Sequence, residues 1–275
     1  MCRVCRVGRL HARHPVRGLA LARCASCGVT CLEPEPSRDS LLDTFQDSYF
    51  QGGHSDGYRD YLAIEPAVRR QARRYLETVT RLDPGGRTLL DVGCAAGFLL
   101  AEAEAAGWQV SGVEPSPGMA REARRRIAGA VTVGDLAALP ARTTPVHVLT
   151  MVNVLEHLTQ PVEVAARLAQ LVRPGGILLI ETWNVEALAA RLLGARWHQW
   201  SPLVPYYYTR RALHVLLGNE FREVRWRRVA KWIPLARGAE ILGSSIARRL
   251  GRAGNVCVPY FTGDLVVSCW RRADG

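Results

Sequence analysis

Three acidic residues of this chain stand at or just after short apolar runs. Asp91 ends one run, Glu114 follows Val113, and Asp135 comes shortly after Val133. If the runs are neighbouring parallel strands, the three carboxylates meet at one edge, where open sheets of this kind bind ligands. Such acids can recognise a ligand rich in hydrogen-bond donors. Glu114 is placed to accept from both hydroxyls of a ribose, and Asp135 from the amino group of a base.

The loop after Asp91 carries the small residues Gly93, Ala95 and Gly97 at alternate positions, and small residues let the backbone approach a ligand closely. A glycine-rich turn alone also fits a dinucleotide enzyme. The carboxylate of Asp91 decides between the two, because it would repel a pyrophosphate and attract an ammonium group. We therefore expect S-adenosylmethionine as the cofactor and disfavour a nicotinamide oxidoreductase. The alternative, that each acid only caps the following helix, explains one acid well and three poorly.

The first segment contains a second group with clear chemistry. Cys2 and Cys5 form one Cys-x-x-Cys pair, and Cys24 and Cys27 form another. Two such turns supply the four sulfurs of a closed tetrahedral site, so the spacing predicts a structural zinc ribbon. Disulfides are the alternative, and a reducing compartment disfavours them. We expect Cys31, outside both pairs, to be a small buried residue.

The elements that would position these residues alternate along the chain. The pattern predicts mainly helix over 39–82, then strands and helices in turn, with a turn at 173–176. The predicted strands are 88–92, 109–113, 131–133, 146–152 and 177–182, with helices at 98–106, 117–127 and 162–171 between them. This alternation is typical of a doubly wound parallel sheet with helices on both faces. Late strands at 221–229 and 264–270 would add an antiparallel edge and complete a mostly parallel seven-stranded α/β sheet.

From Leu89 onward the chain resembles the class I, Rossmann-like S-adenosylmethionine-dependent methyltransferases. More narrowly, it resembles bacterial small-molecule methyltransferases that carry an N-terminal zinc ribbon. The matching stretches are Leu90-Asp91-Val92-Gly93-Cys94, Val113-Glu114-Pro115-Ser116, Val133-Gly134-Asp135-Leu136, Val154-Leu155-Glu156-His157-Leu158 and Leu171-Val172-Arg173-Pro174-Gly175-Gly176. The resemblance implies domains at 1–37 (ribbon), 38–84 (helical lead-in) and 85–275 (methyltransferase).

The resemblance also implies roles for single residues. In the family, the position of Asp91 binds the methionine moiety, that of Glu114 the ribose and that of Asp135 the adenine. The expected cofactor-binding residues are Asp91, Gly93, Cys94, Ala95, Gly97, Glu114, Pro115, Asp135, Leu136 and Asn153. Three positions depart from the family pattern: Ala95 replaces a glycine, His147 a common aspartate, and Asn153 a frequent acid.

His157 is the expected catalytic residue, with Glu156 beside it. Methyl transfer to a hydroxyl needs a group that removes a proton, and histidine is suited to this near neutral pH. Glu156 would orient the imidazole, or both would contact a metal. The alternative is that His157 only packs its helix. A family histidine before the aromatic stretch 203–208 is absent here, so no role is carried over to that stretch.

Two later segments have two interpretations each. Trp197, His198, Trp200 and the tyrosines at 206–208 either wall an apolar acceptor or form a lid packed on its own core. In an extended segment, Tyr206 and Tyr208 would share one face. Residues 235–250 read as an amphipathic helix with Arg237, Arg248 and Arg249. Its basic face is more often solvated than bound to a membrane or an acidic partner.

The formal charge of +11 does not establish a nucleic-acid partner, because the arginines are scattered and Lys231 is the single lysine. No apolar stretch of about 18 residues predicts a membrane span, and the N-terminus has no signal-like apolar core. We therefore expect a cytoplasmic enzyme that methylates an oxygen atom of a small molecule. An RNA methyltransferase that grips its substrate through the ribbon and arginines, and a non-catalytic cofactor-binding protein, are the alternatives. The sequence does not indicate the oligomeric state.

Overall fold

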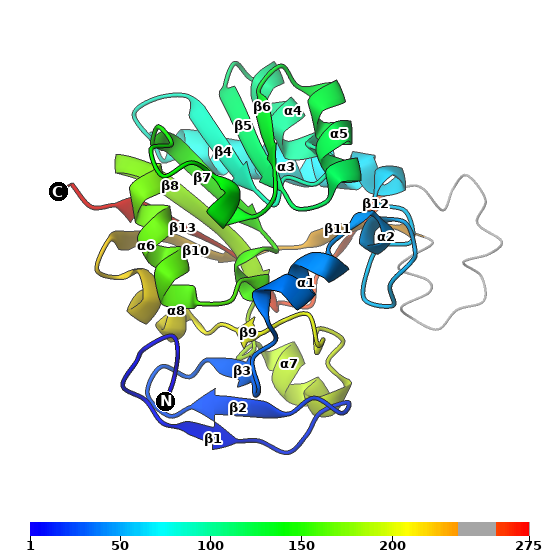
Figure 1. The fold of residues 1–275 in the computed structure, drawn as a ribbon, viewed down its shortest axis with the longest axis vertical. Helices are drawn as coiled ribbons and strands as arrows, with labels where there is room; N and C mark the ends of the chain where they lie inside the picture. Colours follow the sequence, from blue (N-terminus) through cyan, green and yellow to red (C-terminus); the bar gives the residue numbers. More distant parts are fainter. Residues whose placement is uncertain (236–256, 275) are drawn as a thin grey trace.

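The central element is a seven-stranded sheet, as predicted (Figure 1). The computed structural model describes residues 1–235 and 257–274. The strand order is β10 (Phe221–Arg228), β13 (Leu265–Arg272), β8 (Val172–Trp183), β7 (Val146–Val152), β4 (Thr88–Val92), β5 (Gln109–Glu114) and β6 (Ala130–Val133). The strands from β8 to β6 are parallel, and β13 pairs antiparallel with both β8 and β10. The antiparallel edge is therefore confirmed.

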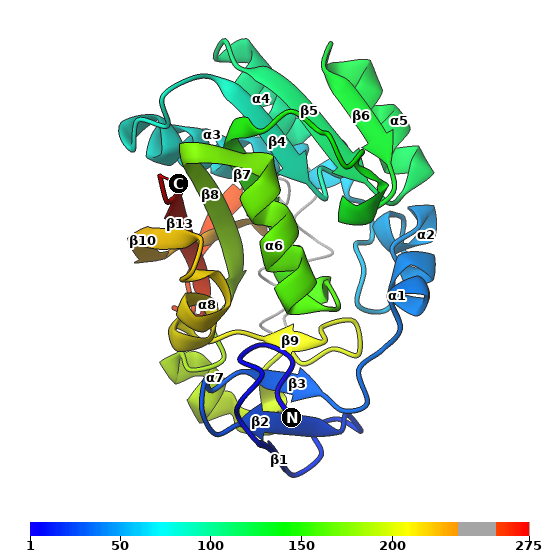
Figure 2. The same cartoon turned by 60° about the vertical axis from the view of Figure 1, so that its left-hand side comes forward.

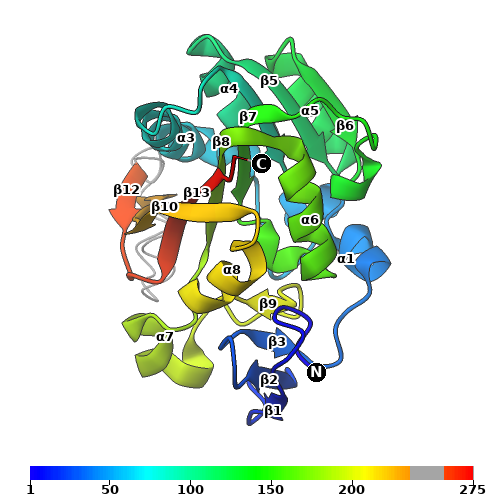
Figure 3. The same ribbon diagram turned by 90° about the vertical axis from the view of Figure 1, so that its left-hand side faces the viewer.

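Helices cover both faces of this sheet (Figure 3). One face packs against α3 (Glu65–Arg81), α4 (Phe98–Ala105) and α5 (Pro117–Arg126), and the other against α6 (Pro161–Leu171) and α8 (Arg210–Leu217). Successive strand residues point to opposite faces, so Leu89 joins the first core and Leu90 the second. This places the carboxyl ends of β4, β5 and β7 together.

The prediction for residues 173–176 was wrong in part. These residues lie inside β8, which begins at Val172 rather than at residue 177. The pairing of β7 with β8 changes register there, since Val146 faces Val172 and Val148 faces Ile177. The extra residues include Gly175, whose φ of 73° bends the strand locally.

The helical lead-in has nearly the predicted bounds, but it is interrupted rather than continuous. It consists of α1 (Arg38–Thr44), α2 (Asp47–Phe50), the 3₁₀ turn η1 (Leu62–Ile64) and the long α3. The inner face of α3 buries Ala72, Tyr75, Leu76 and Val79, as its spacing predicts. The loop 51–61 was not predicted, and its aromatic residues enter the site described below.

The N-terminal segment forms a second sheet beneath the first (Figure 2). Its order is β1 (Leu10–Ala12), β2 (Leu21–Cys24), β3 (Thr30–Leu32) and β9 (Tyr206–Tyr207). The fourth strand comes from a distant part of the chain, so the ribbon and the methyltransferase domain share one sheet. The prediction that Tyr206 and Tyr208 share a face is confirmed, because both join one core and Tyr207 joins another.

The remaining elements are short. They are the helix α7 (Leu188–Leu193), the 3₁₀ turns η2 (Leu136–Ala138), η3 (Leu155–His157) and η4 (Gly194–Arg196), and a two-stranded antiparallel sheet of β11 (Lys231–Pro234) with β12 (Cys257–Tyr260). Apart from Leu235, the amphipathic helix predicted for 235–250 lies outside the described residues. Among the described helices, none combines the length and apolar character that crossing a bilayer requires.

Candidate functional site

A cavity of about 380 Å³ opens where β4, β5 and β7 end, between these strands, α1 and α6. Seven of the ten predicted cofactor residues line it: Gly93, Ala95, Glu114, Pro115, Asp135, Leu136 and Asn153. Asp91, Cys94 and Gly97 do not. The structure therefore brings most of the predicted set together at the expected edge of the sheet.

Glu114 lies at the end of β5 with its carboxylate almost fully buried. Its two oxygens accept from different backbone amides, Oε2 from Ala95 at 2.8 Å and Oε1 from Ser116 at 2.9 Å. A carboxylate has about four acceptor sites, so each oxygen keeps one for a further donor. Burial raises the pKa of Glu114 to about 7, and the two amide bonds oppose this rise. The group therefore offers two free acceptor sites on adjacent oxygens.

Asp91 is deeper than predicted. It is buried, does not line the cavity although Val92 and Gly93 do, and accepts from the Thr150 hydroxyl at 2.6 Å. Burial raises the pKa of Asp91 to about 7. A buried carboxylate of this kind favours a nearby cation, which it would reach through water or after a side-chain rotation.

The loop after Asp91 has an unusual backbone. Gly93, Ala95 and Gly97 all have positive φ, at 73°, 45° and 76°. Ala95 therefore occupies a left-handed conformation that glycine adopts more easily, which explains why glycine is usual there. The Cys94 side chain packs into the core between β4 and α4, and the residue does not line the cavity.

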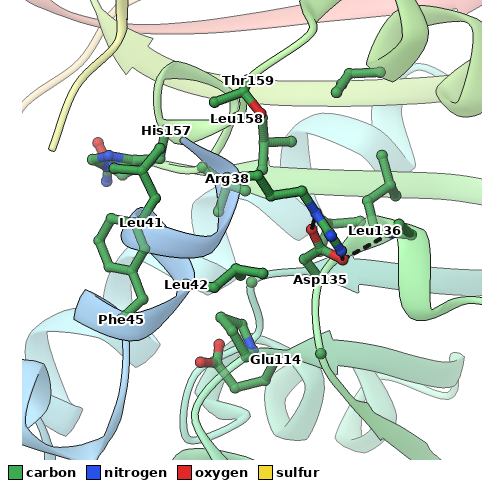
Figure 4. A pocket seen from close by; sticks show the side chains of 18 of the residues that line it. Arg38, Leu41, Leu42, Phe45, Glu114, Asp135, Leu136, His157, Leu158 and Thr159 are labelled. Atoms are coloured by element: carbon green, nitrogen blue, oxygen red, sulfur yellow. Dashed lines mark hydrogen bonds and ion pairs between the residues drawn. The ribbon is translucent and has the colours of Figure 1, made fainter. Parts of the chain in front are cut away.

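Asp135 lines the cavity and caps the turn η2. Its Oδ1 accepts from Ala137 N at 3.0 Å, and Arg38 of α1 donates to both oxygens at 2.7 Å (Figure 4). Burial raises the pKa of Asp135, but the Arg38 guanidinium more than offsets this and holds it below its usual range. Sequence reasoning missed Arg38, because nothing local connects residue 38 to residue 135.

His157 lines the cavity on its apolar side. Its Nδ1 lies 2.7 Å from the carbonyl oxygen of Leu203, so Nδ1 carries the proton and Nε2 has a free lone pair. The ring also contacts Phe45 edge-on, with 5.0 Å between the centroids. Burial lowers the pKa of His157, so the neutral form dominates at pH 7. A neutral imidazole with its tautomer set this way can accept a proton at Nε2.

Glu156 does not line the cavity, although it precedes His157. It is 2% exposed, and neither carboxylate oxygen has a hydrogen-bond partner among the described residues. Burial raises the pKa of Glu156 to about 8. The backbone oxygen of Leu203, rather than Glu156, orients the His157 ring.

An aromatic wall, which the sequence did not reveal, lines part of the cavity. It consists of Phe45, Tyr49, Phe50, Tyr58 and Tyr61. Phe45 and Tyr49 stand edge to face with 5.1 Å between centroids, and Phe50 and Tyr58 are stacked with 6.2 Å between centroids. By contrast, Trp197, Trp200 and Tyr207 pack together in a separate core, so the interpretation of that cluster as an acceptor wall is wrong.

Of the remaining departures from the family pattern, one is distant from the cavity and one lines it. His147 lies at the start of β7, where its ring bonds Thr88 at 2.8 Å, at the opposite end of the sheet from the site. Asn153 lines the cavity with a φ of 52°, which asparagine tolerates better than most residues. Its amide nitrogen donates to Glu181 at 3.0 Å.

The four predicted cysteines of the ribbon converge. All their sulfur atoms lie within 4.8 Å of one another, with 3.7 Å between Cys2 and Cys27 and 3.6 Å between Cys5 and Cys24. Around a tetrahedral ion with Zn–S bonds of about 2.3 Å, neighbouring sulfurs are about 3.8 Å apart. Cys31 is buried outside this cluster, as expected, and its sulfur donates to the Ala22 carbonyl.

Comparison with known proteins agrees with this geometry. A family model described as a methyltransferase domain matches residues 67–220. An uncharacterized methyltransferase of Mycobacterium sp. (strain KMS) is 31% identical over 134 residues, which is 48% of this chain and 53% of that protein. The ubiquinone biosynthesis O-methyltransferase of Xanthomonas axonopodis pv. citri is 32% identical over 127 residues, 42% of this chain and 52% of the relative. The chain therefore spans only about half the length of these curated relatives.

Solved structures agree at the level of the fold. Magnesium protoporphyrin IX methyltransferase from Synechocystis, solved with bound SAH, superposes with a TM-score of 0.57 at 17% identity, over 86% of this chain and all of that one. A SAM-dependent methyltransferase from Archaeoglobus fulgidus gives a TM-score of 0.53 at 17% identity, over 75% of this chain and 94% of the other. At such identities the likeness establishes the architecture alone.

Proposed function

Because this chain belongs to the methyltransferase-domain family, we propose that it uses S-adenosylmethionine to methylate an oxygen atom of a small-molecule acceptor. The observation that carries this proposal is His157. Its free Nε2 belongs to a residue that lines the cavity beside the aromatic wall, and its protonation state suits a general base.

The residues of the cavity fit the cofactor. The two free acceptor sites of Glu114 match two neighbouring ribose hydroxyls, and Asp135 is available to an adenine amino group. Asp91 supplies negative charge for the ammonium group of the methionine moiety, near the loop of Gly93, Ala95 and Gly97. S-adenosylmethionine, when bound, supplies an electrophilic methyl group. The chain itself contributes orientation, through these three acids, and a water-poor enclosure.

The acceptor is expected to be apolar or aromatic. Phe45 and Tyr49 form the wall nearest His157, and apolar walls with few polar groups are typical of small-molecule sites. In this arrangement His157 would hold the acceptor hydroxyl at Nε2 and take its proton as the oxygen attacks. The Leu203 carbonyl stabilises the imidazolium that results, because it keeps accepting from Nδ1.

We also propose that Cys2, Cys5, Cys24 and Cys27 bind a structural zinc ion. The sulfur spacing supports this, and four protein ligands leave no open position for catalysis. The ribbon (1–37), the helical lead-in (38–84) and the methyltransferase domain (85–275) would then form one unit, since β9 belongs to the ribbon sheet and α1 to the wall of the cavity.

The test is a screen with labelled S-adenosylmethionine and hydroxylated aromatic acceptors, followed by the His157→Gln variant. We expect label on oxygen, and a variant whose kcat falls by roughly 10²–10⁴-fold, because a positioned general base contributes about this much. Cofactor affinity should stay within about threefold, since His157 bonds the Leu203 carbonyl rather than any of the three acids.

His214→Gln is the matched control, because that histidine is half-exposed on α8 and pairs with Glu223 away from the cavity. Unchanged turnover in the His157 variant would show that His157 is not the general base. Label found on nitrogen or carbon alone would contradict the proposed chemistry.

A further inference from the structure

Arg38 reaches across the cavity from a part of the chain that the family model does not cover. Its Nε donates to Asp135 Oδ2 and its Nη2 to Asp135 Oδ1, each at 2.7 Å. Figure 4 shows the Arg38 side chain extending from α1 to the Asp135 carboxylate, close to Leu136. A two-pronged pair of this kind fixes the orientation of the carboxylate plane as well as its charge.

The hydrogen-bond capacity of Asp135 is almost used. Oδ1 accepts from Ala137 N and from Arg38, so both its acceptor sites are filled. Oδ2 accepts from Arg38 alone. One acceptor site therefore remains, on Oδ2 of a side chain that is 12% exposed and lines the cavity. A donor in the cavity can use this site without breaking the ion pair.

Both ends of α1 are tied down, so the position of Arg38 is set by the fold. Before α1, the Tyr206 hydroxyl donates to Glu35, and the Ser37 hydroxyl caps the helix through Ser40 N at 3.1 Å. After α1, Asp47 accepts from the Ser116 hydroxyl at 2.5 Å and from Gly118 N at 2.7 Å. The segment 35–47, which carries Arg38, is thus bound at one end to the ribbon side of the protein and at the other end to α5.

The second arginine of the cavity does not act in this way. Arg167 donates to the carbonyl oxygens of Leu139 and Pro140 and to Gln170, and so stabilises a loop rather than an acid. Arg38 is therefore the cavity arginine whose guanidinium is committed to a predicted cofactor residue.

We propose that Arg38 is a positioning residue for the adenine end of the cofactor. It holds Asp135 so that the remaining acceptor site of Oδ2 faces the amino group of the base, and it thereby gives the site its preference for a 6-aminopurine. This inference rests on the proposed function, because it requires that the adenine lies against Asp135. It assigns a cofactor role to the segment between the ribbon and the matched family region.

The test is a double-mutant cycle by calorimetry, with a change in the protein and a change in the ligand. The protein change is Arg38→Gln. The ligands are S-adenosylhomocysteine and its analogue with hydrogen in place of the adenine amino group. The parent protein should bind the parent ligand about tenfold more tightly than the analogue. Arg38→Gln should weaken the parent ligand about tenfold and the analogue less than threefold, and Arg38→Lys should restore part of the difference.

Arg125→Gln is the matched control, since it removes an exposed arginine paired with Glu122 on α5 and changes the net charge equally. Equal weakening of both ligands by Arg38→Gln would mean that Arg38 only stabilises the segment 35–47, and would overturn the inference. Tighter binding of S-adenosylhomocysteine by this variant would overturn it too, because Arg38 would then block the site. Failure of the parent protein to bind S-adenosylhomocysteine would instead contradict the proposed function itself.

Discussion

Glu114→Gln is expected to weaken S-adenosylmethionine binding by at least about 100-fold, measured by calorimetry. The carboxylate bonds two backbone amides and keeps two acceptor sites for the ribose hydroxyls. Each hydrogen bond to a charged group contributes about 1.5–3 kcal/mol, and a loss of about 2.7 kcal/mol corresponds to 100-fold in affinity. Glutamine keeps the shape of the side chain but removes the charge.

Glutamine also disturbs the loop itself. Its amide nitrogen must face either Ala95 N or Ser116 N, because each carboxylate oxygen accepts from one of them, and two donors cannot bond each other. The left-handed loop around Ala95 would lose one anchor. This local effect and the lost ribose contacts act in the same direction on affinity.

Two measurements separate a binding effect from a folding defect. Thermal melting of Glu114→Gln should remain cooperative, and Glu114→Asp should keep charge but retreat from the ribose and so bind weakly. Glu122→Gln removes a carboxylate of α5 that pairs with Arg125 and Arg126, and it should bind the cofactor normally. If a folded Glu114→Gln protein bound S-adenosylmethionine as tightly as the parent protein, Glu114 would not be a cofactor-binding residue.

Cys24→Ser is expected to remove the zinc ion and unfold the ribbon. Structural zinc contributes roughly 10–16 kcal/mol in small zinc domains, which exceeds what a ribbon of this size gains from its own core. Unfolding of the ribbon should also perturb the cofactor cavity, because β3 pairs with β9 and the ribbon leads into α1. We expect zinc below about half an equivalent by elemental analysis, a lower melting temperature and weaker cofactor binding.

Cys31→Ser is the matched control within the same ribbon. Cys31 is buried to a similar degree but lies outside the sulfur cluster, so this variant should keep about one equivalent of zinc. A Cys24→Ser protein with full zinc content, or a parent protein that carries no zinc after careful purification, would contradict the structural metal site.

Local sequence patterns were enough to predict the sheet, and seven of the ten expected cofactor residues line the cavity. The predicted strands 88–92 and 146–152 have the observed bounds, because a short apolar run between turn residues specifies a buried strand by itself. Parallel topology then brings Glu114 and Asp135 to one edge. The four ribbon cysteines meet for a similar reason, since each Cys-x-x-Cys turn sets two sulfurs side by side.

The rest of the site depends on contacts between distant segments. Arg38 meets Asp135, and Leu203 orients His157, through tertiary packing that no local pattern encodes. The aromatic wall combines the end of α1, the helix α2 and the loop 51–61, whose aromatic residues show no periodic pattern in the sequence. Glu156 was expected to orient the His157 imidazole in the catalytic site, but its side chain is buried at η3.

The most direct test of the central claim is a calorimetric titration of the purified protein with S-adenosylmethionine and, separately, with NAD. The three acids predict saturable binding of S-adenosylmethionine at one site per chain, and no binding of NAD, because Asp91 opposes a pyrophosphate in the loop. Binding of NAD, or no binding of S-adenosylmethionine by protein that is folded and zinc-loaded, would contradict the account.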